Sequence, residues 1–323
     1  MKIASIDIGT NTLLLLLGEH NNTVKSDFQT TDIVILNDIH SIARLGEGVS
    51  RTGVISDEAF ARSADILHHY KYLCDAHNVA HITAVATSAV RDAQNGHSVC
   101  ERLGAILNCE IHCISGDEEA RFSFIGTNET GDLCTVVDIG GGSTEYVTGE
   151  NNTISHRMSL QIGAVRLHER FLLSLPPSPK SIIAAREEIR SQLAPLPQAQ
   201  APSAATFAPG DIIGVGGTFT TLAAIDLHLA EYDSARVHNH IMTLETVSHI
   251  TNHLLTTPLS ELLENPAIHP QRADILPAGA LILEETLLFF GAASCKASTK
   301  GLRYGVLYDA FAQWFMHNHN YTQ

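Results

Sequence analysis

The sequence has no apolar segment long enough to cross a membrane. Its 323 residues are 44% hydrophobic and 17% charged, with a single tryptophan. The longest apolar run near the amino terminus, Leu13–Leu17, is far shorter than a bilayer requires. Met1 and Lys2 lead straight into an expected strand, and no signal-peptide cleavage pattern follows. We therefore expect a cytoplasmic globular protein with no membrane partner.

Basic side chains are also scarce. The chain has 20 lysines and arginines against 35 aspartates and glutamates, which gives a net charge of −15. No basic cluster offsets this charge, and proteins that bind nucleic acid through phosphate contacts need such clusters. The composition therefore excludes nucleic acid as an expected partner.

The six cysteines lack the paired spacing of a zinc site. Cys109 and Cys113 flank His112, but no second Cys/His pair lies at a suitable distance along the chain. Cys134 and Cys295 stand in apolar, strand-like runs. The pattern favours buried free thiols over a metal site.

Two common nucleotide-binding motifs are absent. No GxxxxGK[ST] segment occurs, which removes the P-loop NTPases. The glycines of Gly214–Gly217 do not have the GxGxxG spacing of a dinucleotide fingerprint. Any phosphate site must therefore use another kind of loop.

Such a loop lies in Cys134–Val147. A β-branched run ends at Asp138, and three glycines, two hydroxyl residues and Glu145 follow before the next apolar run. This order predicts a strand, a tight glycine turn and a second strand. Backbone N–H groups and hydroxyls in such a turn can bind a phosphate, and Asp138 could hold a metal ion bridged to it. The alternative is a plain glycine-rich hairpin.

The amino terminus repeats this pattern. Residues 5–12 and 136–143 share an apolar–Asp–Ile–Gly–small–small–hydroxyl string. A repeat at this separation indicates two related lobes, each beginning with a strand, a phosphate loop and a return strand. We expect the two loops to face one another and to hold a phosphate chain with its metal.

A third glycine loop, Gly216–Thr218, stands between an expected strand and an expected helix. A helix N-terminus that follows a glycine turn can bind an anion through its unpaired N–H groups. We expect further strands at 2–8, 13–18, 28–36, 80–86, 109–114, 133–137, 145–149 and 153–160. Ala194–Gly210, rich in Pro, Ala and Gln, is expected to be an exposed connector within the second lobe.

Eight motifs together resemble exopolyphosphatases and guanosine pentaphosphate phosphohydrolases, in the actin-like phosphotransferase superfamily. They cover almost the whole chain and lie at residues 7–12, 44–49, 86–91, 114–121, 138–145, 214–218, 272–279 and 301–303. The most specific are Ser-Gly-Asp-Glu-Glu-Ala-Arg at 115–121 and Asp-Ile-Gly-Gly-Gly-Ser-Thr-Glu at 138–145. The resemblance implies an α/β fold of two ribonuclease-H-like domains that flank a central cleft, and hydrolysis of a terminal phosphoanhydride. We expect one domain over 1–125 with a final helix at 310–323, and the other over 126–309.

The resemblance also implies site residues. Glu119 matches the carboxylate that activates the attacking water, and Arg91 matches a phosphate-binding arginine. A surface pair with Asp92 is the alternative for Arg91, and Asp117 and Glu118 are expected only to stabilise the helix dipole. Mg²⁺ or another divalent cation is expected at Asp138, Glu145 and Asp7. The expected phosphate-binding residues are Gly9, Thr10, Asn11, Thr12, Gly140, Gly141, Gly142, Ser143, Thr144, Gly216, Gly217 and Thr218.

Two features differ from the family pattern. Glu often follows Gly-Leu-Arg in the family, whereas Tyr304 stands here. Longer relatives carry an additional helical domain with a His-Asp pair, and this sequence contains no His-Asp dipeptide. We expect the short, two-domain form of the family, with Arg44 and Arg303 as further cations of the cleft.

The expected activity is removal of the terminal phosphate of inorganic polyphosphate. Hydrolysis of the 5′-terminal phosphate of guanosine pentaphosphate is the main alternative, and an actin-like kinase or a non-catalytic sensor are less favoured. A homodimer is expected. The sequence does not decide the substrate preference, the polyphosphate chain length or the identity of the metal.

Overall fold

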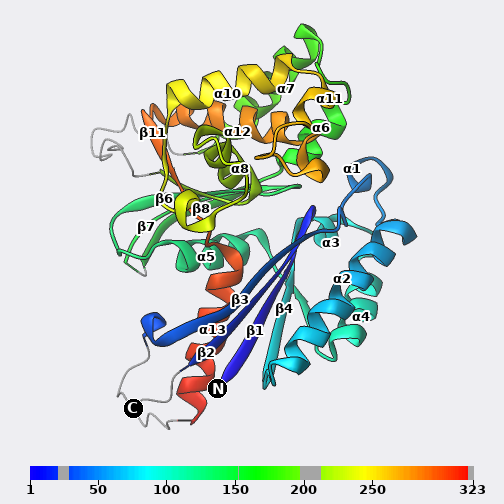
Figure 1. The fold of residues 1–323 in the computed structure, drawn as a ribbon, viewed down its shortest axis with the longest axis vertical. Helices are drawn as coiled ribbons and strands as arrows, with labels where there is room; N and C mark the ends of the chain where they lie inside the picture. The colour runs from blue at the N-terminus through cyan, green and yellow to red at the C-terminus, as the bar shows by residue number, and fades with distance from the viewer. Residues whose placement is uncertain (21–28, 152, 197–211, 319–323) are drawn as a thin grey trace. The chain divides into compact units, whose positions relative to one another are not determined.

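The computed structural model describes residues 1–20, 29–151, 153–196 and 212–318. The chain forms two compact units, Met1–Gly126 with Leu302–Gln323, and Thr127–Gly301 (Figure 1). Residues 302–309, expected in the second domain, lie in the first unit instead. The physical reason is apolar packing, because Leu302 and Val306 join a buried cluster with Val85 and Ile114. Most of the expected connector at 194–210 lies outside the described residues.

The first unit contains a five-stranded mixed sheet in the order β3-β2-β1-β4-β5. Its strands are β1 (Lys2–Ile8), β2 (Thr12–His20), β3 (Ile33–Ile42), β4 (His81–Ala86) and β5 (Ile111–Cys113). β1 pairs antiparallel with β2 and parallel with β4. The strand expected at 28–36 is wrong in its limits, because pairing with β2 continues as far as Thr12 opposite Ile42.

Helices cover both faces of this sheet (Figure 1). The first unit contains α1 (Val49–Thr52), α2 (Asp57–Ala76), α3 (Ser88–Asp92), α4 (Gly96–Leu107), α5 (Gly116–Thr127) and α13 (Leu302–Asn318), with a 3₁₀ turn at Thr30–Asp32. Ile6 and Leu15 pack with Leu67 of α2 on one face. Ile3 and Leu16 pack with Leu307 and Phe311 of α13 on the other.

The second unit contains a six-stranded sheet in the order β10-β11-β9-β6-β7-β8. Its strands are β6 (Cys134–Ile139), β7 (Thr144–Glu150), β8 (Thr153–Leu160), β9 (Ile212–Val215), β10 (Ile241–Thr243) and β11 (Ser294–Ala297). Its helices are α6 (Ala164–Phe171), α7 (Pro179–Leu193), α8 (Gly217–Asp226), α9 (Ser234–Val237), α10 (Leu244–Thr256), α11 (Leu259–Leu262) and α12 (Leu276–Phe290), with a 3₁₀ turn at Pro270–Arg272. One large apolar core joins β6, β7 and β9 to α7, α8, α10 and α12.

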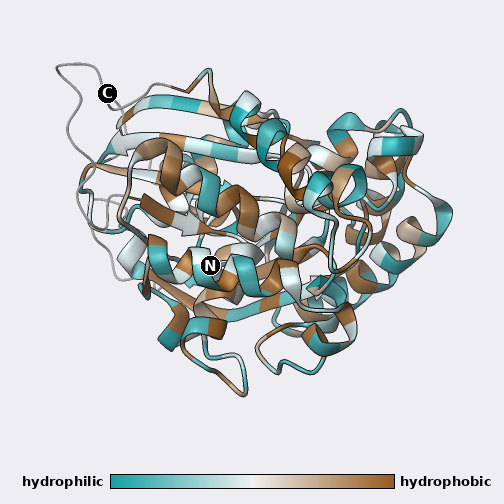
Figure 2. Cartoon of the chain, turned by 90° about the horizontal axis from the view of Figure 1, so that it is seen from above, coloured by the Kyte–Doolittle hydropathy of each residue, from teal (hydrophilic) through white to brown (hydrophobic). Residues whose placement is uncertain are grey.

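The two sheets repeat one topology. In each, two antiparallel hairpin strands are followed by a third, and the first strand also pairs in parallel with a later strand (β1 with β4, β6 with β9). The sequence repeat is therefore a structural repeat. Figure 2 shows helices that alternate between hydrophilic and hydrophobic stretches, as expected where one side is buried.

Two expectations about composition can be compared with the structure. Over the described ranges, no helix is both long and apolar enough to cross a membrane. Cys74, Cys100, Cys134 and Cys295 are buried free thiols as expected, but Cys113 is exposed. The prediction for Cys113 was wrong because it ends β5, which in the described part of the chain lies at the edge of the first sheet.

Candidate functional site

The two Asp–Ile–Gly loops have the same backbone geometry. The Gly9 N–H donates to the Thr12 carbonyl at 3.1 Å, and the Gly140 N–H donates to the Ser143 carbonyl at 3.0 Å. Asp7 and Asp138 stand two residues before these glycines, in β1 and β6. Each loop therefore joins two antiparallel strands by the tight turn that the glycine pattern predicts.

In the second unit, the loop carbonyls are bonded to the start of α6. The N–H of Ala164 donates to the Gly140 carbonyl at 2.9 Å, and the N–H groups of Val165 and Arg166 donate to the Gly141 carbonyl at 2.9 and 3.0 Å. Gly163 must be glycine, because a Cβ there would lie 2.5 Å from the Gly141 backbone. These bonds fix the loop against the start of α6.

The loop of the first unit is held in a similar way by a different segment. The Gly46 N–H donates to the Thr10 carbonyl at 2.8 Å, and the N–H groups of Ala43 and Arg44 donate to the Asn11 carbonyl at 3.0 and 2.9 Å. The Asn11 side-chain oxygen is buried and has no hydrogen-bond partner within the described part of the chain. A buried polar atom of this kind is costly unless a ligand or water completes it.

Arg91 and Glu119 form an ion pair in the first unit. Arg91 Nη1 donates both to the Ile114 carbonyl at 2.8 Å and to Glu119 Oε2 at 3.1 Å. The Glu119 side chain is only 9% exposed, while Arg91 Nη2 is buried without a hydrogen-bond partner among the described residues. The structure thus brings together the two residues expected to be catalytic, and their roles stay a prediction.

Glu118, the neighbour of Glu119, belongs to the helix cap. Its Oε2 accepts from the Ser115 N–H at 2.9 Å and from the Ser115 hydroxyl at 2.8 Å, and the Glu118 N–H donates back to Ser115 Oγ at 3.2 Å. These bonds form a capping box, and the bond from the Ser115 backbone lowers the pKa of Glu118. The expected structural assignment of Glu118 agrees with this geometry.

Asp138 and Glu145 lie directly opposite one another on β6 and β7. Glu145 is 1% exposed, and its Oε1 accepts from the Ser159 hydroxyl at 2.7 Å. Gly216 leaves room beside Asp138, because a Cβ there would lie 3.2 Å from Asp138 Oδ1. One strand pair thus presents two carboxylates on the same face of the sheet, next to the glycine loop.

This donor set fits a hydrated Mg²⁺ ion. Among the described residues, no group of three or more His, Cys, Asp or Glu side chains could enclose a metal. Mg²⁺ characteristically keeps several waters and binds through one or two carboxylates together with substrate phosphates. Asp138 and Glu145 supply that number in the second unit, and Asp7, 8% exposed, is a carboxylate of the first unit.

The third glycine loop precedes α8 in the second unit. Gly216 has φ of 88°, a left-handed conformation that favours glycine, and it caps α8 without a side-chain hydrogen bond. Gly217 lies against the guanidinium of Arg272, with no space for a side chain between them. Burial lowers the pKa of Arg272. The sequence analysis did not single out Arg272. Its place at the start of the motif at 272–279 was the one signal that pointed to it.

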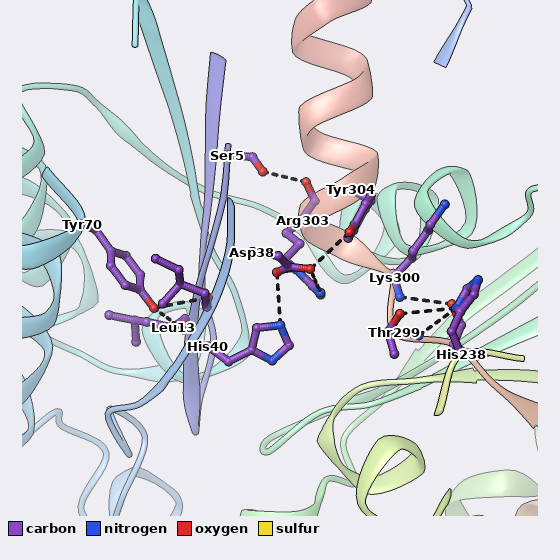
Figure 3. A network of polar contacts seen from close by, with 12 residues as sticks. Ser5, Leu13, Asp38, His40, Tyr70, His238, Thr299, Lys300, Arg303 and Tyr304 are labelled. Atoms are coloured by element: carbon purple, nitrogen blue, oxygen red, sulfur yellow. Dashed lines mark hydrogen bonds and ion pairs between the residues drawn. The ribbon is translucent and has the colours of Figure 1, made fainter. Parts of the chain in front are cut away.

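Two side chains expected in the site are instead hydrogen-bonded to other parts of the protein. The Thr144 hydroxyl is fully buried and donates to the Ile162 carbonyl at 2.7 Å. Arg303, expected as a cation of the cleft, is 4% exposed and donates to both oxygens of Asp38 at 2.8 Å. The expectation for Arg303 is wrong, because the pair with Asp38 fastens α13 to β3 inside the first unit (Figure 3).

The structure also accounts for Tyr304. Its hydroxyl donates to Asp38 Oδ2 at 3.1 Å (Figure 3). A glutamate at this position would place a second carboxylate beside Asp38, and like charges so close repel one another. The tyrosine is thus compatible with the Asp38–Arg303 pair. Arg44 is the other expected cation, and its Nε lies 3.7 Å from Glu47 Oε1. Its place in the cleft stays a prediction.

Comparison with known proteins identifies the class. The model of the Ppx/GppA phosphatase family matches residues 23–313, so the chain belongs to this family of phosphoanhydride hydrolases. Exopolyphosphatase 2 of Mycobacterium tuberculosis is 34% identical over 297 residues, which cover 88% of this chain and 89% of that protein.

Two solved structures show the same fold. An exopolyphosphatase from Cytophaga hutchinsonii is 28% identical and matches with a TM-score of 0.85 over 97% of this chain and 98% of that one. The Ppx/GppA family member from Aquifex aeolicus is 28% identical, with a TM-score of 0.78 over 100% of this chain and 99% of that one. The expected two-domain, actin-like α/β fold is confirmed, whereas the expected cleft stays a prediction.

Proposed function

We propose that this protein removes the terminal phosphate of inorganic polyphosphate and releases orthophosphate. The observation that carries the proposal is the Arg91–Glu119 pair, in which a mostly buried carboxylate is held 3.1 Å from an arginine. The similarity to exopolyphosphatase 2 of Mycobacterium tuberculosis supports the choice of substrate. No observation in this chain favours guanosine pentaphosphate over polyphosphate.

Glu119 is the proposed general base. A carboxylate held by Arg91 can accept a proton from the water that attacks the terminal phosphorus, a contribution of about 10²- to 10⁴-fold in rate. Arg91 Nη2, which is buried and has no partner among the described residues, would bind a phosphate oxygen and offset its charge as the P–O bond breaks.

The glycine loops are the proposed phosphate-binding elements. In the first unit these are Gly9, Thr10, Asn11 and Thr12. In the second they are the N–H groups of Gly141–Ser143, and Gly216–Thr218 at the start of α8. The Gly140 N–H is left out because it donates to the Ser143 carbonyl. We leave the Thr144 hydroxyl out of the set because it is bonded to Ile162.

A divalent cation is the proposed cofactor, with Asp138 and Glu145 to hold it and Asp7 as a further carboxylate. Dependence on such an ion is general in this family. When bound, Mg²⁺ would neutralise phosphate charge and make the phosphorus more electrophilic. Asp138 and Glu145 would orient the waters that complete its coordination.

The deciding experiment compares four substrates under the same conditions. Orthophosphate release with Mg²⁺ is measured for short polyphosphate, long polyphosphate, guanosine pentaphosphate and ATP. We expect the highest kcat/KM with polyphosphate. A higher value with guanosine pentaphosphate would replace the proposed substrate, and phosphate transfer to an acceptor without release would indicate a kinase.

A further inference from the structure

Three consecutive carbonyls of the second glycine loop are held on the side of α6. Backbone N–H groups of α6 bind the Gly140 and Gly141 carbonyls at 2.9 to 3.0 Å. The third carbonyl, that of Gly142, is bonded by a side chain instead, because Arg166 Nε donates to it at 2.7 Å. Arg166 therefore completes what the helix backbone begins.

Because the peptide bond is planar, the positions of these carbonyls also set the directions of the N–H groups that follow them. In a trans peptide the carbonyl and the following N–H point in opposite directions. Carbonyls fixed toward α6 thus direct the N–H groups of Gly141, Gly142 and Ser143 to the opposite side of the loop. Those N–H groups are the ones expected to bind phosphate.

The Arg166 guanidinium is itself held in place. Its Nη2 donates to Gln161 Oε1 at 3.1 Å, so the side chain is held at two of its nitrogens. A hydrogen bond from a charged donor is about twice as strong as one between neutral groups. The Gly142–Ser143 peptide is therefore fixed more firmly than a free glycine loop would be.

The first unit provides a comparison within the same molecule. The turns place Gly9 in correspondence with Gly140, which makes Asn11 the counterpart of Gly142. The Asn11 carbonyl is bonded by two backbone N–H groups, those of Ala43 and Arg44. Backbone donors thus hold this peptide in the first unit, whereas the Arg166 side chain holds it in the second.

We propose that Arg166 is a positioning residue of the phosphate loop. It fixes the Gly142–Ser143 peptide so that the Ser143 N–H faces a bound phosphate. The inference rests on the proposed function of this loop, and it assigns Arg166 no contact with the substrate.

The test compares three variants. Arg166→Gln removes the charged donor, Arg166→Lys keeps the charge but has a different geometry, and Arg170→Gln is the matched control. Arg170 lies on the same helix and pairs with Glu188 at 2.9 Å, with a side chain that is 48% exposed. KM and kcat for polyphosphate are measured, together with pyrophosphate binding by calorimetry and the thermal unfolding midpoint.

We expect Arg166→Gln to raise KM and to weaken pyrophosphate binding about tenfold, the scale of one hydrogen bond from a charged donor. Its kcat should fall much less, and Arg166→Lys should lie between wild type and Arg166→Gln. Arg170→Gln should change neither KM nor pyrophosphate binding. Both Gln variants should have similar thermal unfolding midpoints.

An unchanged KM and unchanged pyrophosphate binding in Arg166→Gln would overturn the inference while leaving polyphosphate hydrolysis intact. An equal loss in Arg170→Gln would also overturn it, since a general effect on α6 would then be the cause. If the wild type bound pyrophosphate with the predicted loss in Arg166→Gln but cleaved no polyphosphate, the positioning role would stand and the proposed substrate would fail. A wild type that neither bound nor cleaved phosphate compounds would overturn both.

Discussion

Glu119 and Glu118 are adjacent acids with different environments. Glu118 is bonded to Ser115 in a capping box, whereas Glu119 is buried against Arg91. We predict that Glu119→Gln lowers kcat at least ~100-fold, because the side chain keeps its size but loses the base. KM should change little. The measurement is steady-state orthophosphate release.

Glu118→Gln is the control for this prediction. It makes the same chemical change one residue away, and we expect nearly normal turnover with a loss of about 0.5–1 kcal/mol in stability from the weakened cap. Near-normal turnover in Glu119→Gln would place the base on another residue.

A substitution of Asp138 tests whether this residue binds the proposed metal ion. We predict that Asp138→Asn raises the Mg²⁺ concentration needed for half-maximal activity, since an amide binds the ion more weakly than a carboxylate. The thermal unfolding midpoint should change little, because Asp138 is only half-buried at the end of β6. Asp132→Asn, at an exposed position before β6, is the control. Full activity in the presence of a chelator would contradict the metal proposal.

At the scale of elements, Asp38 joins β3 to α13. Burial on its own raises the pKa of Asp38, but hydrogen bonds from His40 and Arg303 and the Arg303 charge outweigh it, so the pKa lies well below its usual value. Removal of one partner from a mostly buried pair leaves the other charge uncompensated. We predict that Asp38→Asn lowers the free energy of unfolding by about 3 kcal/mol at pH 7.

The pH dependence of this contribution has a definite sign. A carboxyl whose folded pKa is depressed stabilises the protein fully above its unfolded pKa, about 3.9, and loses that contribution as the pH falls toward the folded pKa. The difference in unfolding free energy between wild type and Asp38→Asn should therefore shrink below about pH 4. Urea unfolding across this range measures it.

Asp75→Asn is the control for the Asp38 pair. Asp75 pairs with Lys71 on the exposed side of α2, and surface pairs contribute only about 0–1 kcal/mol. A similar loss in both variants would show that the Asp38 pair does not fasten α13.

For the whole molecule, we expect charge to limit the length of polyphosphate that the proposed site can bind. Acids exceed bases by 15, and several arginines are paired within the fold, among them Arg170, Arg186, Arg190 and Arg303. A long polyanion gains affinity only where unpaired cations extend beyond the site. We predict distributive hydrolysis, with intermediates of all lengths released.

A gel time course on long polyphosphate in excess tests this prediction. A ladder of intermediates is expected. A persistent long band with orthophosphate and nothing between them would show processive action. Light scattering gives the oligomeric state, since a homodimer could create a longer basic track from two chains.

Short-range features of this protein were determined by the sequence itself. The glycine turns, the Ser115–Glu118 cap and the strands around Asp7 and Asp138 depend on neighbouring residues, and the structure contains all of them. Local sterics and hydrogen bonding are enough to specify such elements, which is why the repeat could be recognised before the fold.

Tertiary structure decided the partners of the charged side chains. Arg91 meets a glutamate 28 residues away, and Arg303 meets an aspartate 265 residues away. β3 extends to Ile42 because β2 pairs with it, and Arg166 reaches Gly142 only because α6 packs on the loop. Chain packing brings these groups together, and no local pattern records the distance between them.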